Sequence, residues 1–586
     1  MIPFVPEVSL CCGCKVKVQK TRLKTVAALE IGEFVAKETI LICPECKKTY
    51  ATQGLDRTVP SGSKFGYDVL VFVGKAAFLR CRSDAEAIQE LAARNIGISP
   101  SEIAYLQKRF IVYLAMAHRQ SAVRIREAIK ARGGYILHLD GTCEGGSPHL
   151  MSGLDEISGI VLHNVKIPSE KAASIIPFLK QIRQDYGMPL AIVSDMSQAI
   201  ANAIKEVFPD VSHFICHFHF LRDIGNDLMA QENDIIRKRL RSHKITAKLL
   251  ARSHGLKQIM DKHPELIDAF HAGVEDGQLP KHLFELAPVV STYGLIRWAL
   301  AGQKQGRGYG FPFDRPYVSF VKRLRIVYTH LEQLSHIRLC GQWRDNKPFY
   351  RACHDVKTVL SDKALNKALC QIEAKSEVFD RLRDAMRITV DGGHHGLNDD
   401  GLEADTKSIE NGVKDFRNWL LHDDRHQENN DYGKMRSQID SYWDKLFADP
   451  IDVDTPEGTV TFQPQRTNNI LERFFRDIKR SHRRKSGTSS MSKKLKAMLA
   501  DTPLVKNLEN EDYLQILLNG HATLEERFSK IDVNDVREAV NKSQEDLERI
   551  PTKIQRLIKK PNLPQIITDL FQKAATNVKS NRVLWS

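Results

Sequence analysis

The chain has 586 residues, of which 42% are hydrophobic and 27% are charged. This length exceeds a single hydrophobic core and predicts about three to five domains, and the composition is that of a soluble globular protein. No run of about 18 apolar residues occurs and the N-terminus lacks a charged region followed by an apolar one, so we expect neither a membrane span nor a secretory leader. The net charge of +14 favours a polyanionic partner such as a nucleic acid, with an ordinary basic surface as the alternative.

Short cysteine pairs stand out near the N-terminus. The eleven cysteines are an odd number, and their pairing indicates thiolate ligands in a reducing compartment rather than disulfides. Two C-x₂-C pairs with strand-like sequence between them predict a zinc ribbon over residues 1–66, because four thiolates can close a tetrahedral Zn²⁺ site. The predicted structural zinc ligands are Cys11, Cys14, Cys43 and Cys46. Cys12 is an alternative to Cys11.

Residues 67–133 are predicted to form a helical DNA-binding unit. The segment 84–95 has apolar residues at helical spacing, and the turn after it contains Gly97, which is suited to the left-handed position that follows a helix. Ser99 then begins a capping box with proline at the first helical position. Helix, tight turn and second helix resemble a helix-turn-helix DNA reader. A plain helical hairpin is the alternative. A DNA reader would present the second-helix residues Gln107, Lys108 and Arg109.

From residue 134 onward, strands alternate with helices. Three strands, a helix, a strand, a helix and a fifth strand are expected in that order. The strands are predicted over 135–140, 149–154, 159–165, 189–195 and 212–216, and the helices over 169–187 and 197–208. This order matches an RNase H-like core, which is a mixed sheet flanked by helices.

The predicted fold class is an α/β RNase H-like core that a large all-helical insertion interrupts. The zinc ribbon and the helix-turn-helix precede the core, and a helical region follows it. Residues 134–220 are expected to form the first part of the core and 221–455 the insertion. Residues 456–490 would supply a closing strand and the last helix of the core, and 491–586 the C-terminal region.

Three acidic residues are the candidate catalytic ligands. Asp140 and Asp195 end the first and fourth predicted strands, which are neighbours in such a sheet, and strand ends of this kind open into a ligand-binding crevice. Glu472 lies on the last core helix. Together these carboxylates can hold two Mg²⁺ or Mn²⁺ ions for phosphoryl transfer. Singly, each has an ordinary explanation as a helix cap or surface ion pair, and Glu457 and Asp477 are nearby alternatives to Glu472.

Two further groups accompany the carboxylates in the sequence. Cys216 and His219 form a C-x₂-H pair without a second pair nearby, so we expect them to shape the site or contact DNA rather than bind structural zinc. A thiolate is also a poor ligand for Mg²⁺. The helix of Glu472 and its extension carry a basic run that either is simply solvated or contacts DNA phosphates: Arg476, Lys479, Arg480, Arg483, Arg484 and Lys485.

The order of these motifs resembles the signature of Mutator-like element DDE transposases and their bacterial insertion-sequence relatives. The matching motifs are Asp-Gly-Thr at Asp140, Ser-Asp at Asp195, the C-x₂-H pair and Thr-Asn-Asn-x-x-Glu at Glu472. In these families the C-x₂-H motif follows the second aspartate, and a mainly helical insertion separates it from the glutamate. The resemblance implies a homodimer or larger assembly, since two DNA ends must be paired.

These observations predict a DNA transposase that binds terminal inverted repeats through the ribbon and the helix-turn-helix. Asp140, Asp195 and Glu472 would hold two Mg²⁺ for cleavage of double-stranded DNA and strand transfer into target DNA. Two alternatives stay open. One is a domesticated, transposase-derived DNA-binding regulator without catalysis, and the other is an RNase H-like nuclease specific for DNA structure. The expected location is on DNA, in the cytoplasm of a bacterium or in the nucleus of a eukaryote.

Overall fold

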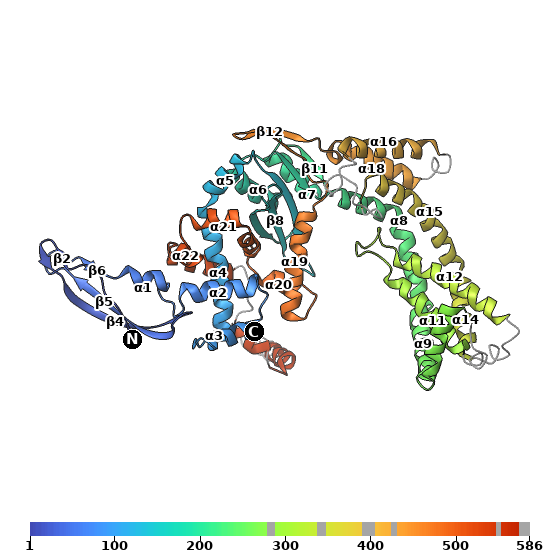
Figure 1. The fold of residues 1–586 in the computed structure, drawn as a ribbon, viewed down its shortest axis with the longest axis horizontal. Helices are drawn as coiled ribbons and strands as arrows, with labels where there is room; N and C mark the ends of the chain where they lie inside the picture. The colour runs from blue at the N-terminus through green and yellow to red at the C-terminus, as the bar shows by residue number, and fades with distance from the viewer. Residues whose placement is uncertain are drawn as a thin grey trace, which may run out of the picture. The chain divides into compact units, whose positions relative to one another are not determined.

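The structure, a computed structural model, describes residues 1–277, 287–336, 347–388, 405–423, 430–545, 552–558 and 560–572. The chain forms two compact units (Figure 1). The first unit comprises Met1–Arg132, Asp140–Gly187 and Leu471–Ser586, and the second comprises Gly133–Leu139 and Met188–Ile470. The chain passes repeatedly between the two units.

The first unit begins with a sheet built around a long β-hairpin. Strands β4 (Lys17–Ala28) and β5 (Gly32–Ile42) pair antiparallel, β1 (Ile2–Phe4) joins β5 in parallel, and β6 (Thr49–Tyr50) pairs with β5. Helix α1 (Gln53–Thr58) follows. The strands predicted for the ribbon are therefore confirmed.

A small core and one glycine hold this hairpin in place. Val26, Ala36, Leu55 and Val59 form a buried cluster. At the hairpin tip Gly32 has a φ of +79°, and a Cβ there would lie 2.8 Å from the carbonyl oxygen of Arg94. Only glycine allows both this left-handed backbone and this close approach.

Four helices follow the ribbon in the first unit. They are α2 (Tyr67–Phe78), α3 (Asp84–Ala92), α4 (Pro100–Gln120) and α5 (Ala122–Ala131). The predicted capping box of Ser99 and Glu102 is present at the start of α4. The left-handed residue between α3 and α4 is Asn95, with a φ of 57°, rather than the predicted Gly97. Helices α2 and α4 touch closely, since a Cβ on Gly74 would lie 2.1 Å from the ring of Phe110.

C-terminal helices complete the first unit. They are the 3₁₀ helix η3 (Thr502–Glu509), α21 (Glu511–Leu518), α22 (Leu524–Phe528), α23 (Val533–Glu545) and α24 (Thr552–Ile558). Phe528 packs against Phe110 and Tyr113 of α4, with ring centroids 5.9 and 5.3 Å apart. The predicted helical character is confirmed for the described residues, and residues 573–586 of this region lie outside them.

Five strands form one mixed sheet in the order β11-β10-β7-β8-β9. The strands are β7 (Ile136–Thr142), β8 (His149–Asp155), β9 (Val161–Ile167), β10 (Ala191–Ser194) and β11 (His213–Ile215). Strand β10 pairs in parallel with both β7 and β11, and β8 pairs antiparallel with β9. Helices α6 (Ala172–Tyr186) and α7 (Gln198–Val207) occupy the predicted connections. The predicted order of strands and helices is confirmed.

The second unit contains the predicted helical insertion. Its described helices are α8 (His217–Ser242), α9 (Ile245–Met260), α10 (Glu265–Asp276), α11 (Ala287–Ala301), α12 (Pro316–Ser335), α14 (Lys347–Leu360), α15 (Lys363–Ala385), α16 (Thr406–His422) and α18 (Asn430–Leu446). They share a core that includes Phe220, Phe320 and Phe379. Across the described ranges, no helix is both long enough and apolar enough to cross a membrane.

The strand that was predicted to close the core sheet does not belong to that sheet. Strand β13 (Gly458–Phe462) pairs antiparallel with β12 (Ile451–Thr455) in a separate two-stranded sheet. The prediction of a closing strand is therefore wrong. The two segments are separated by only a short turn, so local pairing closes a small loop at a low entropic cost.

Candidate active site and metal-binding cysteines

A buried asparagine joins three of the predicted motifs within the second unit. The Asn468 side chain is fully buried; its Oδ1 accepts a hydrogen bond from His138 Nδ1 at 2.7 Å, and its Nδ2 donates to the Leu139 carbonyl at 2.8 Å. Its backbone N–H donates to Cys216 Sγ at 3.2 Å. Asn468 thus connects the strand before Asp140, the start of the C-x₂-H motif and the residues just before α19 (Asn469–Ser486).

Sequence reasoning did not identify Asn468 or His138 as site residues. The available signal was the pair of asparagines ahead of the last core helix, since a buried amide satisfies both a donor and an acceptor on neighbouring segments. The partner ring of His138 is likewise fully buried, between the buried apolar residues Leu137 and Leu139 of β7.

The register between the parallel strands β7 and β10 places Asp140 and Asp195 at equivalent positions along the two segments. Strand β7 pairs with β10 so that Leu139 lies opposite Ser194. Asp140 and Asp195 are the next residues on each chain segment. Parallel strands with this register direct their carboxyl ends toward the same edge of a sheet.

Each aspartate has a local hydrogen bond that orients its carboxylate. Asp140 is 8% exposed, and its Oδ1 accepts from the Gly141 N–H at 2.7 Å. Asp195 is half-buried, and its Oδ1 accepts from the Ser197 N–H at 3.0 Å. Ser197, not Asp195, is the N-cap of α7. The capping alternative for Asp195 is therefore wrong, which leaves its carboxylate group next to the end of β10.

Glu472 occupies the first turn of α19, four residues after Asn468. Its side chain is half-buried, whereas the residues that follow on the same helix become strongly basic and exposed. Lys479 has one weak partner in the first unit, Glu144, at 3.9 Å. The exposed cations that were predicted to contact DNA are Arg476, Lys479, Arg480, Arg483 and Arg484.

The C-x₂-H motif begins α8. Cys216 is fully buried at the N-cap position, and its backbone N–H donates to the Ser194 carbonyl at 2.8 Å. This bond ties the motif to the end of β10, one residue before Asp195. His219 lies three residues further along α8, with its ring 6.2 Å from that of Phe218. The motif therefore directly follows strand β11, as predicted, and the Cys216 thiol is buried rather than exposed to solvent.

Comparison with protein families gives a direct match to this region. Residues 164–223 match the family model of the MULE transposase domain. The match runs from β9 through Asp195 and the C-x₂-H pair into α8, and it confirms the predicted resemblance to Mutator-like transposases. None of the curated proteins compared matches the chain.

The last part of the matched segment packs against the loop between η2 (Gly302–Lys304) and α12. Phe218 stacks on Phe313 with ring centroids 4.6 Å apart, and Tyr309 lies 6.1 Å from Phe218. The Arg222 guanidinium sits 4.5 Å above the Phe218 ring. The aromatic residue inside C-x₂-H is therefore a packing platform, a role that sequence reasoning did not assign.

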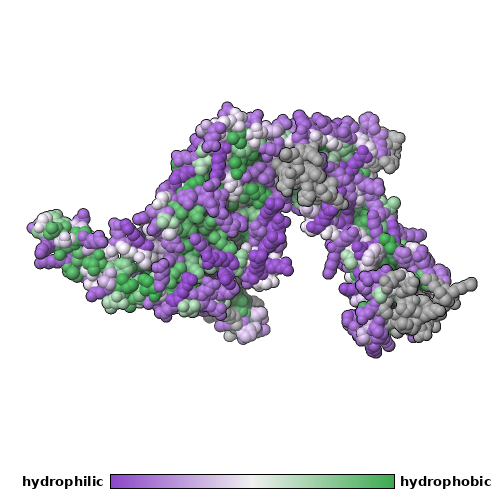
Figure 2. Space-filling model, viewed as in Figure 1, coloured by the Kyte–Doolittle hydropathy of each residue, from purple (hydrophilic) through white to green (hydrophobic). Residues whose placement is uncertain are grey.

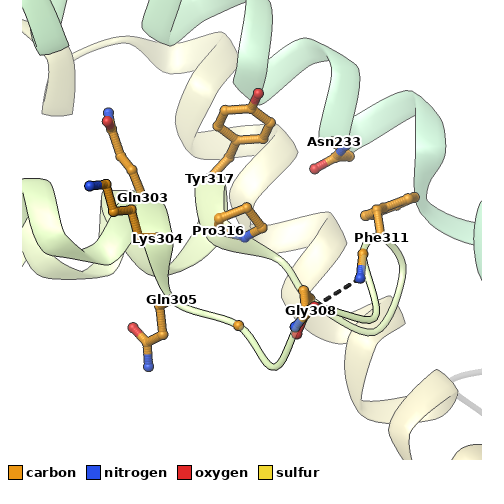
Figure 3. A pocket seen from close by; sticks show the side chains of 11 residues that line it. Asn233, Gln303, Lys304, Gln305, Gly308, Phe311, Pro316 and Tyr317 are labelled. Atoms are coloured by element: carbon orange, nitrogen blue, oxygen red, sulfur yellow. Dashed lines mark hydrogen bonds between the residues drawn. The ribbon is translucent and has the colours of Figure 1, made fainter. Parts of the chain in front are cut away.

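The loop of residues 305–315, which precedes α12, borders a pocket. Asp314 accepts hydrogen bonds from the backbone N–H groups of Arg307 and Gly310 at 2.7 and 2.8 Å. Figure 3 shows the pocket of about 480 Å³ that the loop forms with Asn233 of α8 and Tyr317 of α12. One carboxylate thus orders a glycine-rich segment that has few side chains of its own to pack.

Four cysteine sulfurs gather in the N-terminal ribbon of the first unit. The sulfur atoms of Cys11, Cys12, Cys43 and Cys46 all lie within 4.8 Å of one another. Cys11 Sγ is 3.7 Å from Cys12 Sγ and 3.4 Å from Cys46 Sγ. A tetrahedral ion with Zn–S bonds of about 2.3 Å separates its sulfurs by about 3.8 Å, so the spacing fits zinc. The cluster could hold one Zn²⁺.

One predicted ligand differs in this cluster. Cys12 takes the place of Cys14, which lies outside the group. The cause is the tight hairpin of β2 (Leu10–Cys11) and β3 (Cys14–Lys15), whose turn residues Cys12 and Gly13 have φ values of 51° and 79°. This left-handed turn directs the Cys12 thiol back toward Cys11.

Hydrogen bonding already makes one thiol of the cluster acidic. The backbone N–H of Lys48 and the neighbouring thiols lower the pKa of Cys46 to about 7. Hydrogen bonding with Cys46 and Cys11 raises the pKa of Cys12 to about 12. A bound Zn²⁺ requires all four thiolates, so metal binding would release the remaining protons.

The residues predicted to read DNA on α4 differ in exposure. Arg109 is 5% exposed and donates to the Tyr113 hydroxyl at 3.3 Å, so the prediction that it faces DNA is wrong. It lies on the face of α4 that packs against the other helices of the unit. Gln107 is half-buried and donates to Asp84 at 2.8 Å, and Lys108 is also half-buried.

Proposed function

We propose that this chain is a DNA transposase that cleaves and joins DNA at a two-metal site formed by Asp140, Asp195 and Glu472. The observation that carries the proposal is the Asn468 side chain, which joins β7 just before Asp140 to the segment just before α19. Its backbone also contacts Cys216, which follows Asp195 in the matched MULE domain. The three acidic positions are thus tied through their neighbours to one buried residue.

The strand order supports an RNase H-like core for this site. The parallel pairing of β7 with β10 ends at Leu139 and Ser194, one residue before an aspartate on each segment, and β7 itself continues through Asp140 to Thr142. Carboxylate oxygens are the ligands that Mg²⁺ and Mn²⁺ prefer. Two such ions would activate a water or a 3′-hydroxyl and stabilise the leaving oxygen. The three carboxylates would hold and orient these ions, and Glu472 would bring the basic face of α19 toward the scissile phosphates.

The modules at the N-terminus would select the DNA. A ribbon closed by zinc and the helices α3 and α4 together form the proposed reader of terminal inverted repeats. Gln107 and Lys108 remain its candidate base or phosphate contacts. Pairing of two ends would require a homodimer or a larger assembly on DNA.

A DNA-binding regulator without catalysis is the main competing function. The presence of all three carboxylates favours an enzyme, because a regulator has no chemical need for acidic residues at these strand ends. A nuclease that cuts without strand transfer shares the same site, and the ribbon and helical unit ahead of the core favour transposition over it.

A cleavage assay with matched acidic controls tests the proposal. Asp140→Asn, Asp195→Asn and Glu472→Gln should each abolish Mg²⁺-dependent cleavage of the element's own ends while leaving end binding intact. Glu457→Gln and Asp477→Asn replace the neighbouring acidic residues and should cleave like the parent. Cleavage at the parental rate by any of the first three variants would contradict the site, and cleavage without strand transfer by the parent would favour the nuclease.

A further inference from the structure

A small pocket lies in the first unit, partly lined by residues of α19 that follow Glu472. It has a volume of about 130 Å³ and forms where α19, α20 (Ser492–Ala497), η3 and the end of α2 meet. In Figure 1, α20 and the end of α2 lie near the lower part of α19. The apolar part of its lining is Phe78, Leu79, Phe474, Ile478, Met498, Pro503 and Val505. About four water molecules would fill this volume.

Two lysines of the lining share one aromatic ring. The Nζ atoms of Lys485 and Lys494 lie 5.3 and 5.9 Å from the centroid of Phe78. Both side chains are half-buried. Among the described residues, neither ammonium group makes an ion pair or a hydrogen bond. Two like charges therefore lie beside one aromatic ring in largely apolar surroundings.

The carboxylates around the pocket have other partners. Glu509 pairs with Lys506 at 2.6 Å, and Asp477 lies 4.0 Å from both Lys506 and Arg480. Asp84 accepts a hydrogen bond from Gln107. In the described structure neither lysine has a carboxylate within ion-pair distance, and Asp84 acts on both only through a longer-range attraction that raises their pKa values.

Desolvation makes this pair costly without an anion. Burial, followed by the charge of Lys494, lowers the pKa of Lys485 to about 8, and burial lowers the pKa of Lys494 as well. An anion bound between the two ammonium groups would reverse both effects, because an opposite charge at short range favours the charged form. The arrangement is therefore suited to an anionic ligand.

The surroundings indicate which anion. The outer face of α19 carries Arg476, Arg480, Arg483 and Arg484, all exposed, and Figure 2 shows hydrophilic residues along this helix. A row of exposed cations that leads to a pocket of two lysines matches a chain of regularly spaced phosphates better than a single carboxylate. We propose that Lys485 and Lys494 together bind one phosphate group of a DNA strand in this pocket. The choice of DNA as the source rests on the proposed function.

Competitive amine labelling tests the pocket in the full-length protein. Acetic anhydride at pH 8 modifies neutral amines, and mass spectrometry reports each lysine. A bound phosphate that raises the pKa of Lys485 by about one unit lowers its neutral fraction about fivefold. We expect a 30-base-pair end duplex, and inorganic phosphate at higher concentration, to protect Lys485 and Lys494. Chloride at equal ionic strength should protect neither, and exposed Lys493 and Lys496 of α20 serve as internal controls for inorganic phosphate.

Salt dependence of DNA binding supplies the second measurement. Lys485→Met, Lys494→Met and the double variant should each reduce the slope of log K against log salt by about one, because both lysines hold the same phosphate. If the double variant lost about two units of slope while each single variant lost about one, the lysines would contact two separate phosphates, and this result would overturn the proposal. Unchanged slopes would overturn it as well.

The labelling results separate this proposal from the proposed function. Protection by inorganic phosphate but not by DNA would assign the pocket to a free phosphate and refute DNA as its source. Protection by neither would refute the pocket, even if the parent protein binds and cleaves DNA normally. A parent protein that binds no DNA would refute the proposed function, and labelling with inorganic phosphate would still decide whether the pocket takes a phosphate group.

Discussion

Asn468→Ala is the sharpest test of how the candidate site is assembled. The substitution removes the acceptor for His138 and the donor to the Leu139 carbonyl, at 2.7 and 2.8 Å, inside a fully buried environment. Each buried partner left unsatisfied costs about 1–3 kcal/mol, so the free energy of unfolding should fall by about 2–6 kcal/mol. The strand end before Asp140 would also lose its connection to the segment before α19.

A matched asparagine separates stability from positioning. Asn507 is 2% exposed and makes two side-chain hydrogen bonds to Val161, at 2.8 and 2.9 Å, in the first unit. Asn507→Ala should therefore destabilise the protein by a similar amount, measured by urea unfolding. Its cleavage rate per folded molecule should stay at the parental value.

Cleavage of end DNA, normalised to the folded fraction, is the deciding assay. Asn468→Ala should cleave far more slowly than Asn507→Ala at equal folded fraction, while both bind the DNA ends. Asn468→Asp keeps the acceptor for His138 but loses the donor to Leu139, so it should be intermediate in stability and low in cleavage. Equal cleavage by Asn468→Ala and Asn507→Ala would refute a positioning role for Asn468.

Three further predictions concern the metal cluster, a buried histidine and the basic helix. Cys12→Ser should lose zinc in metal analysis, whereas Cys14→Ser should keep about one Zn²⁺ per chain, and the reverse result would restore the ligand set expected from the spacing alone. Burial lowers the pKa of His118 to about 4. The unfolded chain therefore takes up this proton at a higher pH than the folded protein, and the free energy of unfolding falls as the pH drops below about 6.5. Between pH 7 and pH 5, the free energy of unfolding measured in urea should fall by about 2 kcal/mol less for His118→Gln than for the parent. An equal fall in the free energy of unfolding for both proteins would show that His118 does not cause this pH dependence. The Arg483→Ala, Arg484→Ala double variant should lower the salt slope of end binding by about two if each arginine contacts one phosphate, and an unchanged slope would leave both as solvated surface.

The order of secondary structure was predictable from the sequence because it depends on local patterns. Apolar runs, capping residues and turn residues act over a few positions, and they correctly predicted β7 to β11 and the capping box at Ser99. The motif order around Asp195 was also sufficient to identify the resemblance that the MULE domain match confirms. Such local features depend only on residues that are close in the sequence, so they can be predicted from it.

Contacts between distant segments could only be decided by the tertiary structure. The burial of Arg109 depends on which helices pack over α4, and the hydrogen bonds of Asn468 join residues more than three hundred positions apart in the sequence. The selection of Cys12 over Cys14 depends on a left-handed turn and on where Cys43 and Cys46 lie. Side-chain direction and burial are set by packing partners that are remote in sequence, so periodicity and spacing alone do not determine them.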